Sequence, residues 1–156
     1  MKQNNIQQTL DKAERECFNA GLRLTTKRRQ VLKILLQTQE PLSAYEIAEQ
    51  FKTATGNSLS AMSAYRMLDF LLEAGLVHKL DTTNQYLACA HIICEHPHQI
   101  PQFLICDNCH RVEEVGVDKP LLDELKASIA RTGFELLNQQ LELHGICADC
   151  KKPAQG

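Results

Sequence analysis

The chain of 156 residues lacks several features that would place it in a common class. Its N-terminus is polar and no apolar segment follows, so no secretory signal peptide is expected. No apolar run approaches the roughly 20 residues of a membrane-spanning helix, and no internal repeat or low-complexity tract is present. The sequence therefore predicts a cytoplasmic protein without membrane contact, built as one ordinary domain or two small ones.

Strong charge of one sign is also missing, because the net charge is only −2. The charged residues are unevenly distributed along the chain. Residues 1–84 hold eleven Lys/Arg and nine Asp/Glu, a net of +2, whereas residues 85–156 hold six and ten, a net of −4. The first half is thus mildly suited to a polyanion and the second is not.

Cysteine, by contrast, is well represented, with seven residues. Four of them form two Cys-x2-Cys pairs, Cys106/Cys109 and Cys147/Cys150. Two such pairs complete a tetrahedral zinc shell that leaves no open position, so a structural zinc site is expected. A disulfide framework or a redox couple is the alternative, but an odd cysteine count and a cytoplasmic setting disfavour it.

Hydrophobic spacing predicts four helices and a hairpin in the first half. The third helix opens at the capping box Ser43-Ala44-Tyr45-Glu46 and stops at Gly56, and the fourth is capped by Ser58 or Ser60. The other expected elements are helices over 6–20 and 26–37 and strands over 76–80 and 85–89. This order is typical of a winged helix-turn-helix; a small helical bundle that ends in a hairpin is the alternative.

The fourth helix has two different sides. The buried stripe is expected to contain Ala61, Ala64, Leu68, Leu71 and Leu72, and the opposite side to show Ser60, Ser63, Arg66 and Met67. Small polar residues and an arginine near a helix start suit the major groove of DNA. Serine permits close approach, and arginine can reach guanine O6 and N7.

The second half begins with a linker, residues 90–101, that contains two prolines and the possible ligands His91, Cys94, His96 and His98. Beyond it the pattern predicts strands over 102–105 and 112–115, a helix over 118–132 and a strand over 134–144. A sheet with one helix, sharing its apolar faces with a partner, is the expected architecture. Because this half is small for a stable core, zinc and dimerisation would both stabilise it.

Two further candidate ligands lie on the predicted hairpin. If residues 81–84 form its turn, Leu76 faces Cys89, and His78 is diagonal to Cys89 on the same face. Diagonal neighbours are roughly 7–8 Å apart at the backbone, within reach of one shared ion.

Several segments occur in a characteristic order. They are Arg23-Leu24-Thr25-Thr26-Lys27-Arg28, Ser43-Ala44-Tyr45-Glu46, Tyr65-Arg66-Met67-Leu68-Asp69-Phe70-Leu71, Gly75-Leu76-Val77-His78-Lys79 and the two cysteine pairs. Together they resemble the ferric uptake regulator family of metal-sensing repressors, over about residues 8 to 151, and most of all its zinc-responsive members.

The resemblance implies an α+β chain with an N-terminal winged helix-turn-helix domain and a small C-terminal α/β dimerisation domain. The implied boundaries are 1–89 for the DNA-binding domain, 90–101 for the hinge and 102–156 for the dimerisation and metal-binding domain. The residues expected to contact DNA are Arg28, Tyr45, Ser60, Ser63, Tyr65 and Arg66.

The resemblance also supplies the remaining ligands of a second, regulatory zinc site. They are a linker histidine, best matched by His98 with His96 as the alternative, and an acid best matched by Glu114. The resulting set, His78, Cys89, His98 and Glu114, contains a thiolate, which favours zinc over ferrous iron. Two Zn²⁺ ions per chain are therefore expected, one structural and one regulatory.

The expected function is a zinc-responsive repressor of zinc-uptake genes. A homodimer would bind a palindromic operator in double-stranded DNA, with zinc as the co-repressor that closes the domains into a DNA-competent form. An iron- or peroxide-sensing regulator of the same family is the alternative. An enzyme is not expected, nor is a small-molecule substrate, because the four-cysteine site is closed and no catalytic arrangement is suggested.

Overall fold

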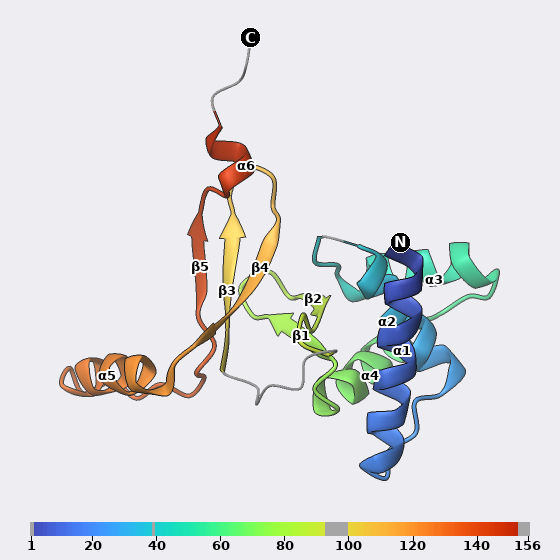
Figure 1. Cartoon of the computed structure of the whole chain (residues 1–156), viewed down its shortest axis with the longest axis horizontal. Coiled ribbons are helices and arrows are strands. Elements are labelled where there is room, and N and C mark those ends of the chain that lie inside the picture. Colours follow the sequence, from blue (N-terminus) through green and yellow to red (C-terminus); the bar gives the residue numbers. More distant parts are fainter. Residues whose placement is uncertain (1, 39, 93–99, 153–156) are drawn as a thin grey trace. The chain divides into compact units, whose positions relative to one another are not determined.

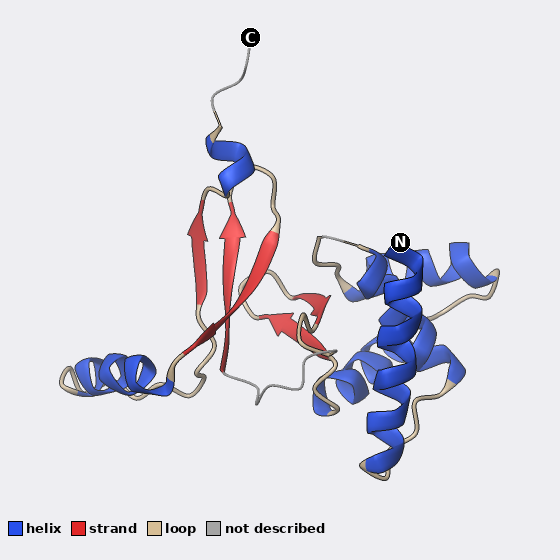
Figure 2. Cartoon of the chain, in the orientation of Figure 1, coloured by secondary structure: helices blue, strands red, loops and turns tan. Residues whose placement is uncertain are grey.

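The computed structural model describes residues 2–38, 40–92 and 100–152 (Figure 1). The chain divides into two compact units, Met1–Cys94 and Glu95–Gly156. Helices dominate the first unit, whereas the second is built on a three-stranded sheet (Figure 2). Within the described ranges, no helix is long and apolar enough to span a membrane.

The first unit begins with four helices. They are α1 (Lys2–Asn19), α2 (Thr26–Gln37), α3 (Ala44–Thr55) and α4 (Ala61–Glu73). All four expected helices are confirmed, although α1 starts before the predicted residue 6. The capping box of α3 is complete, because the Glu46 N–H donates to Ser43 Oγ at 3.2 Å and the Ser43 N–H donates to the Glu46 carboxylate at 2.7 Å. Gly56 ends α3 in the left-handed region, at φ 74°.

A short hairpin completes the first unit and makes it a winged helix-turn-helix, as predicted. Strands β1 (Val77–Leu80) and β2 (Gln85–Ala88) pair antiparallel, with Val77 opposite Ala88. The segment before α3 joins this hairpin through a bridge between Leu42 and Tyr86. The hairpin is therefore attached to the helices both through the chain after α4 and through the segment before α3.

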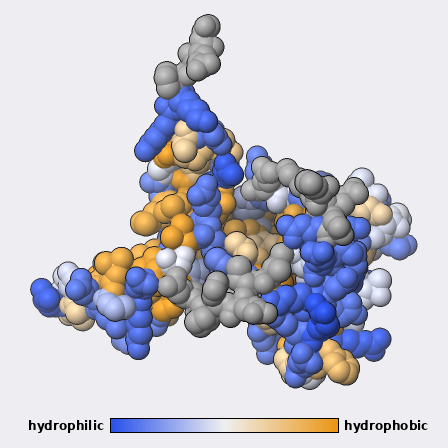
Figure 3. All heavy atoms as spheres, viewed as in Figure 1, coloured by the Kyte–Doolittle hydropathy of each residue, from blue (hydrophilic) through white to orange (hydrophobic). Residues whose placement is uncertain are grey.

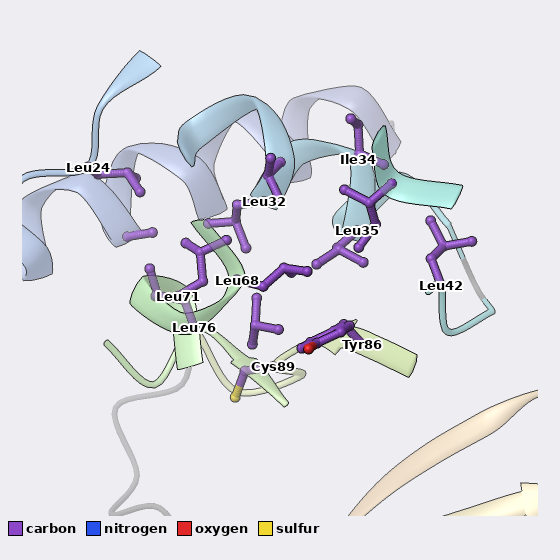
Figure 4. Packing of buried hydrophobic residues seen from close by; sticks show 14 of the residues in the cluster. Leu24, Leu32, Ile34, Leu35, Leu42, Leu68, Leu71, Leu76, Tyr86 and Cys89 are labelled. Atoms are coloured by element: carbon purple, nitrogen blue, oxygen red, sulfur yellow. The ribbon is translucent and has the colours of Figure 1, made fainter. Parts of the chain in front are cut away.

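The core of the first unit fixes α4 against the other helices and the hairpin (Figure 4). Ala64, Leu68 and Leu71 of α4 are buried, as the stripe predicts, while Ala61 and Leu72 are only half-buried. Each fully buried leucine stabilises the fold by about 1.5–3 kcal/mol. The outward side of α4 is consequently presented from a rigid support.

The second unit contains a mixed sheet in the order β4-β3-β5. Its strands are β3 (Ile100–Cys106), β4 (Val112–Val117) and β5 (Glu142–Gly145), and its helices are α5 (Lys119–Ala130) and α6 (Ala148–Lys151). Strand β3 pairs antiparallel with β4 and parallel with β5. Strands β3 and β4 and helix α5 confirm the predicted elements, with β3 starting at Ile100.

The predicted strand over 134–144 is wrong in its first part, because only Glu142–Gly145 forms a strand. The side chain of Gln102 forms hydrogen bonds with the backbone groups just before β5. Its amide nitrogen donates to the Gln139 carbonyl at 3.1 Å, and its amide oxygen accepts from the Leu141 N–H. Of the alternating apolar residues upstream, Phe134 is 67 % exposed and Leu136 is only half-buried.

Candidate functional site

The four paired cysteines meet at one end of the sheet of the second unit. Cys106 ends β3 and Cys109 lies in the turn after it, whereas Cys147 directly precedes α6 and Cys150 lies within that helix. Because β3 and β5 run parallel, both cysteine loops leave the sheet at the same end, where the two strands finish. The four sulfur atoms all lie within 4.8 Å of one another.

The sulfur spacing fits one tetrahedral zinc ion. Zn–S bonds of about 2.3 Å place two sulfur atoms of a tetrahedron about 3.8 Å apart, and the Sγ atoms of Cys109 and Cys147 are 3.8 Å apart. All cysteines in the described ranges are free thiols. These four residues could therefore hold zinc in a closed shell, without a free position for a substrate.

Polar contacts hold the two cysteine loops together independently of their sulfur atoms. Arg111 Nη1 lies 3.1 Å from Asp149 Oδ2, and His144 Nδ1 lies 2.7 Å from Asp107 Oδ1. The Asp107 N–H also donates to the Gly145 carbonyl at 2.9 Å. The loops are thus brought into register by the protein chain itself, which lowers the cost of assembling a metal shell.

Two thiols of the cluster, Cys106 and Cys150, differ in acidity. The backbone N–H groups of Cys109 and Cys147 donate to the Cys106 sulfur and lower its pKa to about 6, so at neutral pH this group is a thiolate. A hydrogen bond from Asn108 lowers the pKa of Cys150, but the neighbouring Cys147 sulfur and the loss of hydration outweigh it and raise that pKa to about 12. The Cys106 thiol therefore loses its proton far more readily than the Cys150 thiol.

A second pair of possible ligands lies on the wing of the first unit. The Cys89 N–H donates to the Leu76 carbonyl at 2.9 Å, which continues the ladder of β1 and β2 in the expected register. His78 and Cys89 consequently share one face of the hairpin, with ligand atoms within 4.8 Å of each other. Cys89 is only 3 % exposed and lies at the edge of the core (Figure 4).

The other predicted ligands of this site come from elsewhere in the chain. Glu114 lies on β4 of the second unit, opposite Phe103, and Glu113 points to the other face of the strand. His96 and His98 lie outside the described residues. The complete regulatory set stays a prediction.

Tyr45 of α3 lies beside Tyr65 and Arg66 of α4. Tyr65 is half-buried, with part of its side chain packed against the core. Tyr45, at the start of α3, is 65 % exposed, and its ring meets that of Tyr65 edge to face, at a centroid distance of 6.5 Å and an angle of 88°. Arg66 is exposed, and within the part of the chain that the structure describes its guanidinium forms no ion pair with a carboxylate. This group could reach a ligand outside the protein.

Other residues expected to contact DNA have roles inside the protein. Ser60 caps α4 by accepting from the Ser63 N–H at 3.1 Å, and its hydroxyl also contacts that of Ser63 at 2.9 Å. The guanidinium of Arg28 lies 3.8 Å from the centre of the Phe70 ring and donates to the Arg23 carbonyl at 2.8 Å. Their contacts with DNA stay predictions.

One expectation for α4 is wrong. Met67, predicted on the outward side, is half-buried and packs against the core, because the apolar face of α4 extends around the helix. Met62 is instead the exposed methionine, at 67 %. Its position one turn before Arg66 is the sequence signal that would have identified it.

Comparison with known proteins agrees with this architecture. The chain is 35 % identical over 153 residues to the zinc uptake regulation protein of Escherichia coli (strain K12), covering 96 % of this chain and 85 % of that protein. It is 29 % identical over 139 residues to the ferric uptake regulation protein of Synechococcus elongatus, covering 88 % and 91 %. A solved zinc uptake regulator complexed with zinc and DNA superimposes with a TM-score of 0.80 at 34 % identity, covering 93 % of this chain and 94 % of that one. Residues 19–151 match the model of the ferric uptake regulator family, and the chain therefore belongs to that family.

Proposed function

We propose that this protein is a zinc-responsive, DNA-binding repressor of zinc-uptake genes. The winged helix-turn-helix supplies the DNA-reading element, with Tyr45, Tyr65 and Arg66 on the outward side of α3 and α4. The likeness to a zinc uptake regulation protein and to a regulator solved with zinc and DNA supports both the ligand and the partner. Arg28, Ser60 and Ser63 would add contacts at the phosphate backbone or groove edge.

The observation that carries the proposal is the position of a nitrogen and a sulfur ligand on the wing. His78 lies on β1 and Cys89 directly follows β2, with ligand atoms within 4.8 Å of each other. Leu76 connects this pair to the helix, because its backbone carbonyl accepts from the Cys89 N–H and its side chain is buried in the core. Metal binding by His78 and Cys89 can therefore affect α4, the helix proposed to read DNA.

A zinc ion supplies several directional bonds and so can tie together side chains from separate parts of a chain. In the regulatory site His78 and Cys89 would bind from the wing, His98 from the hinge and Glu114 from β4, with His96 as the alternative to His98. All four side chains could reach the ion only in a narrow range of orientations of the two units. Occupancy would thus favour one orientation, which we infer to be the DNA-competent one.

The four-cysteine shell would have a different task. Cys106, Cys109, Cys147 and Cys150 would hold a zinc ion that stabilises the second unit and stays bound when the regulatory ion leaves. Each chain would consequently bind two zinc ions with very different rates of release.

A homodimer would complete the second unit. Its sheet and α5 enclose an open groove of about 570 Å³, lined mainly by leucine and valine. Of the twelve residues of α5 only Leu122 is buried, while Leu121 is 60 % exposed. Apolar atoms gather over α5 and the neighbouring sheet (Figure 3). A second copy on this face would bury them and present two recognition helices to a palindromic operator.

The identity of the sensed metal is tested by DNA binding in metal buffers. The wild-type full chain, loaded at its four-cysteine site, would be titrated against a random duplex pool at fixed free Zn²⁺ or, without oxygen, fixed free Fe²⁺. We expect sequence-selective binding to rise steeply with free Zn²⁺ and to respond weakly to Fe²⁺. An equal or stronger response to Fe²⁺ would contradict the zinc assignment.

That outcome would favour the alternative, an iron- or peroxide-sensing regulator of the same family. The 29 % identity to a ferric uptake regulation protein keeps it open. The thiol of Cys89 opposes it, because a soft sulfur ligand suits zinc better than labile ferrous iron.

A further inference from the structure

An apolar side chain stands exposed at the start of the outward side of α4. Met62 is 67 % exposed, although it is the second residue of the helix that follows the Ser60 cap. In the described residues it belongs neither to the core nor to the apolar side chains packed against the core. Its methyl and thioether groups therefore contribute little to folding in the unbound protein.

The neighbours of Met62 are the groups expected to read DNA. Tyr65 and Arg66 follow it by three and four residues, so all three side chains adjoin on one surface of α4. Tyr45 extends this surface through its edge-to-face contact with Tyr65. In a helix-turn-helix the N-terminal residues of the recognition helix contact the base edges, and Met62 occupies such a position.

We propose that Met62 contacts the 5-methyl group of a thymine in the major groove, beside the base that Arg66 reads. The inference rests on the proposed function, because it assumes that α4 enters the groove. The thymine methyl is the apolar group that base edges display there. An unbranched thioether side chain adapts to such a group without requiring a fixed geometry, whereas the mutually bonded Ser60 and Ser63 hydroxyls offer no comparable apolar surface.

The test removes only the methyl group. A duplex would be selected from a random pool by zinc-loaded wild-type protein, and each thymine would then be replaced in turn by uracil, which lacks the 5-methyl group. We expect the affinity to depend on the methyl group of one thymine in each half-site. Its replacement should weaken binding about fourfold, the effect of losing one buried methyl group, and replacement in both half-sites should weaken binding roughly fifteenfold.

Variants assign this effect to one side chain. Met62→Ala should bind the thymine and uracil duplexes equally, and Met62→Leu should keep most of the discrimination. Phe18→Ala is the matched control, because Phe18 is an 80 % exposed apolar residue on α1, and it should discriminate like the wild type.

The outcomes separate this inference from the proposed function. Zinc-dependent binding with a thymine preference that persists in Met62→Ala would overturn the role of Met62 alone. Wild-type binding that shows no preference for thymine over uracil at any position would also overturn the role of Met62. Failure of the wild type to select any duplex in the presence of zinc would overturn the proposed function, and this inference with it.

Discussion

Replacing Cys109 by serine should destabilise the second unit selectively. Cys109 is exposed, so the change removes a proposed zinc ligand without creating a cavity in the core. The buried apolar side chains in the described part of this unit, apart from cysteine, are Phe103, Ile105 and Leu122. At about 1.5–3 kcal/mol each they contribute about 5–9 kcal/mol, less than the roughly 10–16 kcal/mol of a structural zinc ion.

Hydrogen exchange followed by mass spectrometry would measure this loss in each unit separately. In Cys109→Ser we expect the Phe103 amide, which donates to the Leu141 carbonyl, to exchange at least about 100-fold faster, because local opening costs less free energy. The Tyr86 amide, which donates to the Leu42 carbonyl in the first unit, should be unchanged. Cys17→Ser, which also removes a thiol, should leave β3 protected. Normal protection of β3 in Cys109→Ser would refute the structural role of the zinc shell.

Four further changes probe other parts of the molecule. Ser43→Ala removes the α3 cap and should lower the free energy of unfolding of the first unit by about 1 kcal/mol in urea titrations; no change would mean that the capping box is not stabilising. Arg111→Ala breaks the ion pair with Asp149. The two side chains are 46 % and 67 % exposed, and an exposed ion pair contributes little free energy, so a chelator should remove the structural zinc only a few times faster. Complete loss of zinc would contradict a minor role of this ion pair. Leu121→Asp should weaken the dimer at least about tenfold in sedimentation experiments, because it places a charge on the apolar groove, and a dimer of normal affinity would place the interface elsewhere. Arg66→Ala should cost about 1–3 kcal/mol in operator affinity and abolish a guanine preference in selection experiments; retention of that preference would assign the guanine contact to another residue.

The features that could be predicted from the sequence depend on short-range signals. The capping box at Ser43 and Glu46 lies within one helical turn, and the register of the hairpin follows from its four-residue turn at 81–84. The cysteine pairs were recognisable because their spacing alone allows both sulfur atoms to reach one ion.

The features that could not be predicted depend on contacts between distant residues. The alternation of apolar residues over 134–144 indicates a strand. Nothing in that segment reveals that the Leu141 N–H donates to the side-chain amide oxygen of Gln102. Arg28 looks like a free cation beside Lys27, and its stacking on Phe70 exists only once α2 and α4 pack. In both cases a tertiary interaction overrides a local pattern.

The most direct test of zinc-controlled DNA binding compares two buried thiols of the first unit. Cys17 and Cys89 are each 3 % exposed in the same core, but only Cys89 is expected to bind the regulatory ion. Wild type, Cys89→Ser and Cys17→Ser would be titrated with a selected operator across a series of zinc buffers. We predict that affinity rises steeply with free zinc for wild type and Cys17→Ser, and stays low for Cys89→Ser. Equal zinc-dependent binding by all three proteins would contradict a regulatory site that contains Cys89.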